Sequence, residues 1–182
     1  MSSGVDFPLK FFQQYANKYM TDLQPYCERF LVVGSVRRCK PVVHDIEFLV
    51  IPKQTQTTDM FGTAGKPTIE LDAVIGDLVR GWNASLITNG ERLKKVILAE
   101  GLPLEINISS ETRWAVESVI KTGPADFSRR VVTTRRQGGL LPSNCVIKDG
   151  WQVYRNGSLV PMQNEEEFLE FLELGWINPQ ER

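Results

Sequence analysis

Apolar residues recur along the chain at two spacings, and each spacing predicts a different element. Intervals of three and four residues are typical of amphipathic helices, whereas alternating apolar and polar positions are typical of strands. The first part of the chain is therefore expected to contain a helix over 7–30, strands over 30–33 and 45–51, a helix over 69–80, a hairpin of 84–88 and 92–98 around Asn89-Gly90, and a strand over 102–108. The polar stretch 54–67 is expected to be a loop.

The second part of the chain predicts a shorter series of elements. These are a helix from 110 to about 123, a basic helix over 125–137, a hairpin of 145–147 and 152–154 around Asp149-Gly150, and a helix over 165–174. The expected fold class is α+β, with one lobe of residues 1–122 and a smaller helix–hairpin–helix lobe of residues 123–182. Trp114, Trp151 and Trp176 are expected to pack in the core or between the lobes.

Composition and charge narrow the class of protein. Three cysteines at irregular spacings predict neither a disulfide framework nor a thiolate zinc site. No apolar run approaches the roughly 20 residues of a membrane helix, and no secretion signal opens the chain, so a soluble cytoplasmic protein is expected. Net charge is −1, yet residues 121–155 carry seven basic residues against two acids. That surplus suits contacts with phosphates, and a solvated helix face accounts for it equally well.

Three carboxylates are the candidate catalytic and metal-binding residues. Asp45 and Glu47 lie two apart on one predicted strand, so both side chains leave the same face. Alternation along the strand 102–108 allows Glu105 to join them. Converging carboxylates suit Mg²⁺ or Mn²⁺ rather than zinc, and two such ions are what nucleotidyl transfer requires. Taken alone, an Asp-x-Glu pair is more often a solvated strand face.

A turn that precedes these carboxylates is the candidate phosphate-binding segment. Gly34 and Ser35 follow a predicted strand, where a glycine allows close approach of the backbone and the next amides can donate to an anion. Arg37 or Arg38 is expected to hold the same anion with its guanidinium. The order of strand, Gly-Ser turn and acidic strand predicts a nucleotidyltransferase.

These segments resemble the polymerase beta nucleotidyltransferase superfamily, and later ones resemble its family X DNA polymerases. The resemblance rests on FLVVGSVRR at 30–38, HDIEFLV at 44–50, LEI at 104–106, KTG at 121–123, DFSRR at 126–130, the segment 157–161, EEEF at 165–168 and LGWINPQER at 174–182. It covers about residues 28–182. The similarity implies a polymerase beta-type palm with a mixed sheet, followed by a small thumb. Because only about 28 residues precede the motif, the chain is expected to resemble the small viral members that lack further DNA-gripping modules.

The resemblance also assigns expected roles to individual residues. Asp45, Glu47 and Glu105 would bind two Mg²⁺ or Mn²⁺ ions. The nucleotide-binding residues would be Gly34, Ser35, Arg37, Arg38, Gly123, Asp126 and Ser128. The DNA-binding residues would be Lys94, Lys95, Arg129 and Arg130, although a solvated strand face explains the two lysines equally well. The partners implied are a primed or gapped DNA duplex and a deoxynucleoside triphosphate, bound by a monomer with no membrane contact.

Departures from the family pattern keep other functions open. The family usually has aspartate at all three metal positions, whereas Glu47 and Glu105 stand at two of them. The leading expectation is template-directed, gap-filling DNA synthesis in repair. One alternative is a nucleotidyltransferase acting on a small molecule, RNA or protein. The other is a catalytically inactive, DNA-binding palm.

Overall fold

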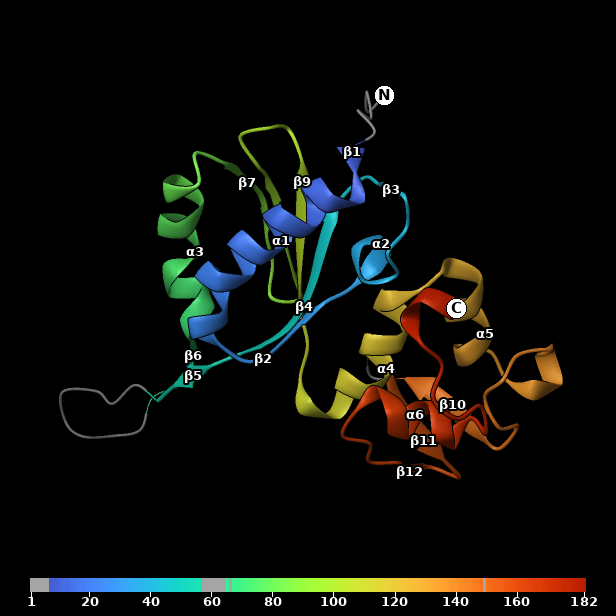
Figure 1. The fold of residues 1–182 in the computed structure, drawn as a ribbon. Coiled ribbons are helices and arrows are strands. Elements are labelled where there is room, and N and C mark those ends of the chain that lie inside the picture. Colours follow the sequence, from blue (N-terminus) through green and yellow to red (C-terminus); the bar gives the residue numbers. More distant parts are fainter. Residues whose placement is uncertain (1–6, 57–64, 66, 149) are drawn as a thin grey trace.

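The computed structural model describes residues 7–56, 65, 67–148 and 150–182 (Figure 1). Its main sheet has five strands in the order β2-β4-β9-β8-β7. Their bounds are Cys27–Val32 for β2, Ile46–Pro52 for β4, Ser85–Asn89 for β7, Leu93–Ile97 for β8 and Pro103–Ile108 for β9. The neighbours β4 and β9 are parallel and the other pairs antiparallel, so the sheet is mixed. The expected α+β class is confirmed.

Two helices cover one face of this sheet. These are α1 (Leu9–Leu23) and α3 (Glu70–Gly81), which flank the sheet in Figure 1. Their buried side chains pack with alternate residues of the central strands, including Phe12, Leu23, Ile46, Phe48, Leu71, Ile75, Leu104 and Ile106. Because successive strand residues point to opposite faces, Glu47 and Glu105 lie on the face that α1 and α3 leave uncovered.

The second lobe has its own core and shares one helix with the first. Its elements are α5 (Ala125–Val132), a 3₁₀ turn η2 (Arg135–Gln137), β10 (Cys145–Lys148), β11 (Gln152–Arg155), β12 (Ser158–Leu159), α6 (Glu165–Phe171) and a 3₁₀ turn η3 (Pro179–Glu181). Helix α4 (Glu111–Thr122) supplies Ala115, Val116 and Val119 to this core. Trp114 of the same helix packs instead on Val33, Leu49 and Ile51 beside the sheet. Helix α4 therefore joins the two lobes.

Three predicted helices are shorter in the structure than their patterns indicated, and one of them, expected over 165–174, ends at Phe171. The helix expected over 7–30 ends at Leu23, followed by the 3₁₀ turn η1 (Gln24–Tyr26) and then β2. Pro25 explains the end, because proline lacks a backbone N–H and disfavours helical geometry in the residue before it. The helix expected over 125–137 ends at Val132, where β-branched residues follow one another through Thr134.

The remaining described elements are short. They are α2 (Gly34–Arg37), the ribbon of β1 (Phe7–Pro8) with β3 (Val42–Val43), and the ribbon of β5 (Gln54–Thr55) with β6 (Thr68–Ile69). The predicted loop 54–67 thus has a paired strand at its start. Residues 57–64 and 66 of that loop, and Asp149 of the predicted hairpin turn, lie outside the described residues. Within the described ranges, no helix combines the length and apolar character needed to cross a membrane.

Candidate active site

The three predicted carboxylates come together at one end of the sheet. Glu47 and Glu105 are aligned partners on the parallel strands β4 and β9, and Asp45 stands one residue before β4 begins. All three side chains are partly buried. The charge of Glu105 raises the pKa of both Asp45 and Glu47, and the charge of Asp45 also raises the pKa of Glu47. These three residues are called the carboxylate cluster below.

The carboxylate cluster carries negative charge that its surroundings do not fully compensate. Burial, followed by the charges of Asp45 and Glu105, raises the pKa of Glu47 to about 7. Burial and then the charge of Glu105 raise the pKa of Asp45. Both effects disfavour the ionised form, as expected for carboxylates that leave water and face one another. An added cation would relieve both.

Gly34 is required here by the side chain of Glu47. Its φ is +66°, and a Cβ built on it would overlap a carboxylate oxygen of Glu47. The expected role of Gly34 was to let the backbone approach a phosphate. In the structure the space beside its Cα is filled by Glu47, whose extra methylene relative to aspartate extends the carboxylate to the turn. Any larger residue at position 34 would displace Glu47.

Ser35 and Arg38 face the same region with polar atoms left unsatisfied. Among the described residues, buried side-chain atoms without a hydrogen-bond partner include Ser35 Oγ and Arg38 Nε. Arg38 Nη1 donates to the carbonyl oxygen of Thr122, and Asp45 and Glu47 both act electrostatically on its guanidinium. Gly123 lies against Arg38, since a Cβ there would come within 2.7 Å of Nη1. Ser35 and Arg38 are thus placed to receive an anion beside the carboxylate cluster.

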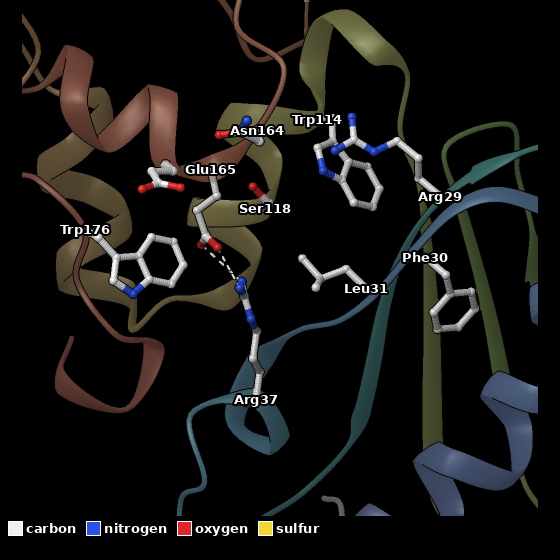
Figure 2. A pocket seen from close by; sticks show the side chains of 10 residues that line it. Arg29, Phe30, Leu31, Arg37, Trp114, Ser118, Asn164, Glu165 and Trp176 are labelled. Carbon is white, nitrogen blue, oxygen red and sulfur yellow. Dashed lines mark hydrogen bonds and ion pairs between the residues drawn. The ribbon is translucent and has the colours of Figure 1, made fainter.

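Arg37 points elsewhere, and the expectation that it holds a triphosphate is wrong for this structure (Figure 2). It forms a bidentate ion pair with Glu165, with Nη1–Oε1 and Nη2–Oε2 distances of 3.0 and 2.6 Å, and Nη1 also donates to Thr122 Oγ1. Consecutive helical residues are rotated by about 100° from one another. Only one of the two arginines of α2 can therefore face the carboxylate cluster, and that one is Arg38.

The two lysines expected at DNA have different positions from those predicted. Lys94 is 2% exposed, and its ammonium bonds to Asp72 of α3 and to Asn89, so it is not available to DNA. Lys95 points to the opposite face, where Nζ lies 2.5 Å from Glu105 Oε1. Alternation along β8 explains the correction, because neighbouring residues of a strand cannot share a face. Lys95 therefore contacts the carboxylate cluster.

The residues predicted on the second lobe are mostly on its surface. Asp126 and Arg129 are exposed and form a loose ion pair at 3.6 Å, and Arg130 is also exposed. The hydroxyl of Ser128 donates to the carbonyl oxygen of Ile120 at 2.8 Å. The proton of Ser128 is therefore used within the protein, and it is not free to donate to a nucleotide. Arg129 and Arg130 keep the exposure that contact with DNA requires.

The fit of a metal ion rests on the chemistry of the donor set. Carboxylates on two adjacent parallel strands, with raised pKa values for two of them, suit a hard divalent cation. In the part of the chain that the structure describes, no group of three His, Cys, Asp or Glu side chains is already arranged around a common point.

Residues to which the sequence analysis assigned no metal or nucleotide contact also reach the site. Lys121, at the end of α4, acts on Glu47 as a compensating positive charge. The KTG motif at 121–123 marked this segment in the sequence, and the tertiary fold brings the helix end to the sheet. Glu165 and Arg182 were likewise assigned no role, yet Arg182 Nη1 lies 2.6 Å from Glu165 Oε1, and Glu165 also binds Arg37.

A separate cavity of about 450 Å³ lies between edge strand β2, α4 and the second lobe (Figure 2). Its walls include Leu31, Trp114 and Trp176. Trp114 is buried as expected, with the Arg29 guanidinium 4.5 Å from its ring centroid. Trp176 is not in the core, since it is 52% exposed, but it lines this cavity between the lobes, which was the other position expected for it. Trp151 is also exposed. The Arg37–Glu165 ion pair lies within the cavity wall, away from the carboxylate cluster.

The raised pKa of Glu47 predicts how stability depends on pH in the absence of metal. The native state favours the protonated form, so this stabilisation is present below the unfolded pKa of about 4.5 and is lost as pH rises towards 7. Between pH 5 and 7.5, Glu47→Gln should gain about 2 kcal/mol relative to wild type. Urea unfolding with a chelator at both pH values measures it. An unchanged difference between the two proteins would contradict the prediction.

Comparisons with known proteins do not extend these observations. The chain matches no model of a known protein family, and a search of curated proteins finds no match. The candidate site therefore rests on its own residues: Asp45, Glu47 and Glu105 on one sheet face, with Ser35 and Arg38 beside them.

Proposed function

We propose that this chain is a metal-dependent nucleotidyltransferase that adds nucleotides from deoxynucleoside triphosphates to a DNA 3′-hydroxyl under the direction of a template. The observation that carries the proposal is the alignment of Glu47 with Glu105 on parallel strands, with Asp45 one residue before β4. The Gly34-Ser35 turn lies directly against this alignment. An anion-binding turn beside three carboxylates is the arrangement that transfer of a nucleotide requires.

The residues of the site divide into those that hold cations and those that hold phosphate. Asp45, Glu47 and Glu105 would bind two divalent cations. When bound, these ions would activate the attacking hydroxyl and neutralise charge on the leaving pyrophosphate. Ser35 Oγ, which has no hydrogen-bond partner among the described residues, would donate to a phosphate oxygen. Arg38 would face the same phosphates with its guanidinium. The role that the sequence analysis gave to Arg37 or Arg38 thus falls to Arg38 alone.

Two further steps concern the proton and the geometry of attack. Glu105 is the carboxylate in contact with solvent-facing Lys95, and we assign it the orientation of the primer 3′-hydroxyl and acceptance of its proton. The rigid register of β4 and β9 would hold Glu105 at a constant distance from Glu47. Most of the rate acceleration would then come from positioning and from neutralisation of charge.

The second lobe supports DNA as the acceptor. Arg129 and Arg130 are exposed on α5, close in sequence to the Gly123 turn that contacts Arg38. Lys94, which the sequence also suggested for DNA, is buried against Asp72 and is excluded from this role. The proposed DNA surface therefore consists of the second lobe and the open face of the sheet.

If α5 contacts DNA phosphates, removing its arginines will lower the salt dependence of binding. Each phosphate contact contributes about 0.9 to the slope of log affinity against log salt for duplex DNA. Arg129→Ala combined with Arg130→Ala should thus reduce the slope by about 2, as measured by fluorescence anisotropy at several salt concentrations. Arg80→Ala, an exposed arginine on α3, is the control and should leave the slope unchanged. Equal slopes for wild type and the double variant would exclude α5 from the DNA surface.

The proposed function is tested by extension of a labelled primer on a duplex with a one-nucleotide gap. Each deoxynucleotide is supplied separately with Mg²⁺ or Mn²⁺, and a chelator provides the control without metal. Addition of the templated nucleotide alone, and only with metal, supports a DNA polymerase. Metal-dependent addition without regard to the template would point to a different acceptor.

Failure to extend the primer with either metal would overturn the proposal. Tight DNA binding under the same conditions would then favour the inactive, DNA-binding palm. Weak DNA binding would favour a nucleotidyltransferase that acts on a small molecule, RNA or protein, and release of pyrophosphate in the presence of candidate acceptors would identify it.

A further inference from the structure

A lysine ammonium occupies the side of the carboxylate cluster that Glu105 forms. Lys95 Nζ lies 2.5 Å from Glu105 Oε1, and the side chains are 45% and 23% exposed respectively. The contact is built into the sheet, since Lys95 and Glu105 are aligned partners on the antiparallel strands β8 and β9. Facing residues on such strands have Cβ atoms only about 5 Å apart, so the ammonium cannot move far without a change of rotamer.

Positive side chains around the carboxylate cluster offset part of its negative charge. Lys95 and Arg38 both act on Asp45, and Lys121 and Arg38 both act on Glu47. Lys95, Arg38 and Lys121 therefore place positive charge near the carboxylate cluster. A divalent cation that enters this site gains less than it would from three uncompensated carboxylates, because the lysine and arginine charges repel it.

Lys95 is able to move away from the carboxylate cluster, whereas Arg38 is not. Arg38 is anchored to the Thr122 carbonyl oxygen, whereas the nearly half-exposed side chain of Lys95 can swing into solvent. An ion pair with one partner nearly half exposed contributes little to stability. The free energy needed to separate Lys95 from Glu105 is therefore small compared with the attraction between Glu105 and a divalent ion.

We propose that Lys95 is an internal counter-ion of the carboxylate cluster that competes with divalent cations for Glu105. Metal binding then requires displacement of the Lys95 ammonium, which raises the cation concentration at which the site fills. The inference rests on the proposed function for the identity of the metal site, and it adds a residue that sets the site's affinity for metal.

Direct titration with Mn²⁺, followed by the electron paramagnetic resonance signal of the free ion, tests this role without any turnover. Lys95→Met should bind Mn²⁺ at least about tenfold more tightly than wild type, since removing one positive charge beside the site removes its repulsion. Lys95→Arg keeps the charge and should bind as weakly as wild type. Lys53→Met, which loses the same charge at the far end of β4, should also match wild type.

Two outcomes would overturn the inference. One is equal Mn²⁺ affinity for wild type and Lys95→Met, and the other is absence of binding by both proteins, because the variant should expose the site. Loss of the gained affinity on adding Asp45→Asn to Lys95→Met would locate the ion at the carboxylate cluster. Tighter metal binding without nucleotide addition would leave this inference standing and reject the proposed function, so the two failures are distinguishable.

Discussion

Asp45→Asn is expected to lower metal-dependent nucleotide addition by at least about 10²–10³-fold, the loss typical when one preorganised electrostatic group is removed from an active site. Asparagine preserves the shape of the side chain and removes only its charge. Asp45 stands where β4 begins and is affected by Glu105, so its charge belongs to the shared field of the carboxylate cluster. Primer extension under single-turnover conditions measures the effect.

Stability separates this loss from misfolding. Burial and Glu105 raise the pKa of Asp45, so the charged form is disfavoured in the native state without metal. A neutral asparagine should therefore leave the free energy of unfolding unchanged or slightly higher. Asp77→Asn, the same substitution at an exposed position of α3, should retain full activity. If Asp45→Asn keeps activity within about tenfold of wild type, the carboxylate cluster is not the catalytic centre.

The second large effect is expected from Glu165, which binds two arginines. Its side chain is 9% exposed and accepts hydrogen bonds from Arg37 and Arg182, whose side chains are 17% and 0% exposed. Glu165→Gln keeps the volume but leaves both guanidinium groups without their counter-ion. Removal of one partner from a buried ion pair typically costs about 3–5 kcal/mol, and we expect a loss in this range.

Chemical unfolding of Glu165→Gln beside Glu166→Gln measures that loss. Glu166 is the next residue of α6 and is exposed, so its substitution should change the free energy of unfolding by less than about 0.5 kcal/mol. The difference between the two variants reports the ion pairs that tie α2 to the second lobe. A loss below about 1 kcal/mol for Glu165→Gln would show that solvent replaces the missing carboxylate.

Local patterns in the sequence were sufficient to predict the order of most elements and the core of the candidate site. Alternation along 45–51 and 102–108 predicted two strands with Glu47 and Glu105 on faces that could meet, and the structure aligns them as partners. The same patterns predicted the α+β class, whereas the mixed sheet was expected from the family resemblance. Such features depend on side-chain periodicity, which a single strand or helix records in its own residues.

Contacts between distant segments were decided only by the tertiary structure. The sequence placed Arg37 beside Arg38 and Lys94 beside Lys95, and it could not say which member of each pair faces the carboxylate cluster. Arg37 pairs with Glu165, 128 residues away, and Lys94 bonds to Asp72 on α3. Neighbours on an element point in different directions, so their roles depend on what packs against each side. That information lies in the assembled fold rather than in the local pattern.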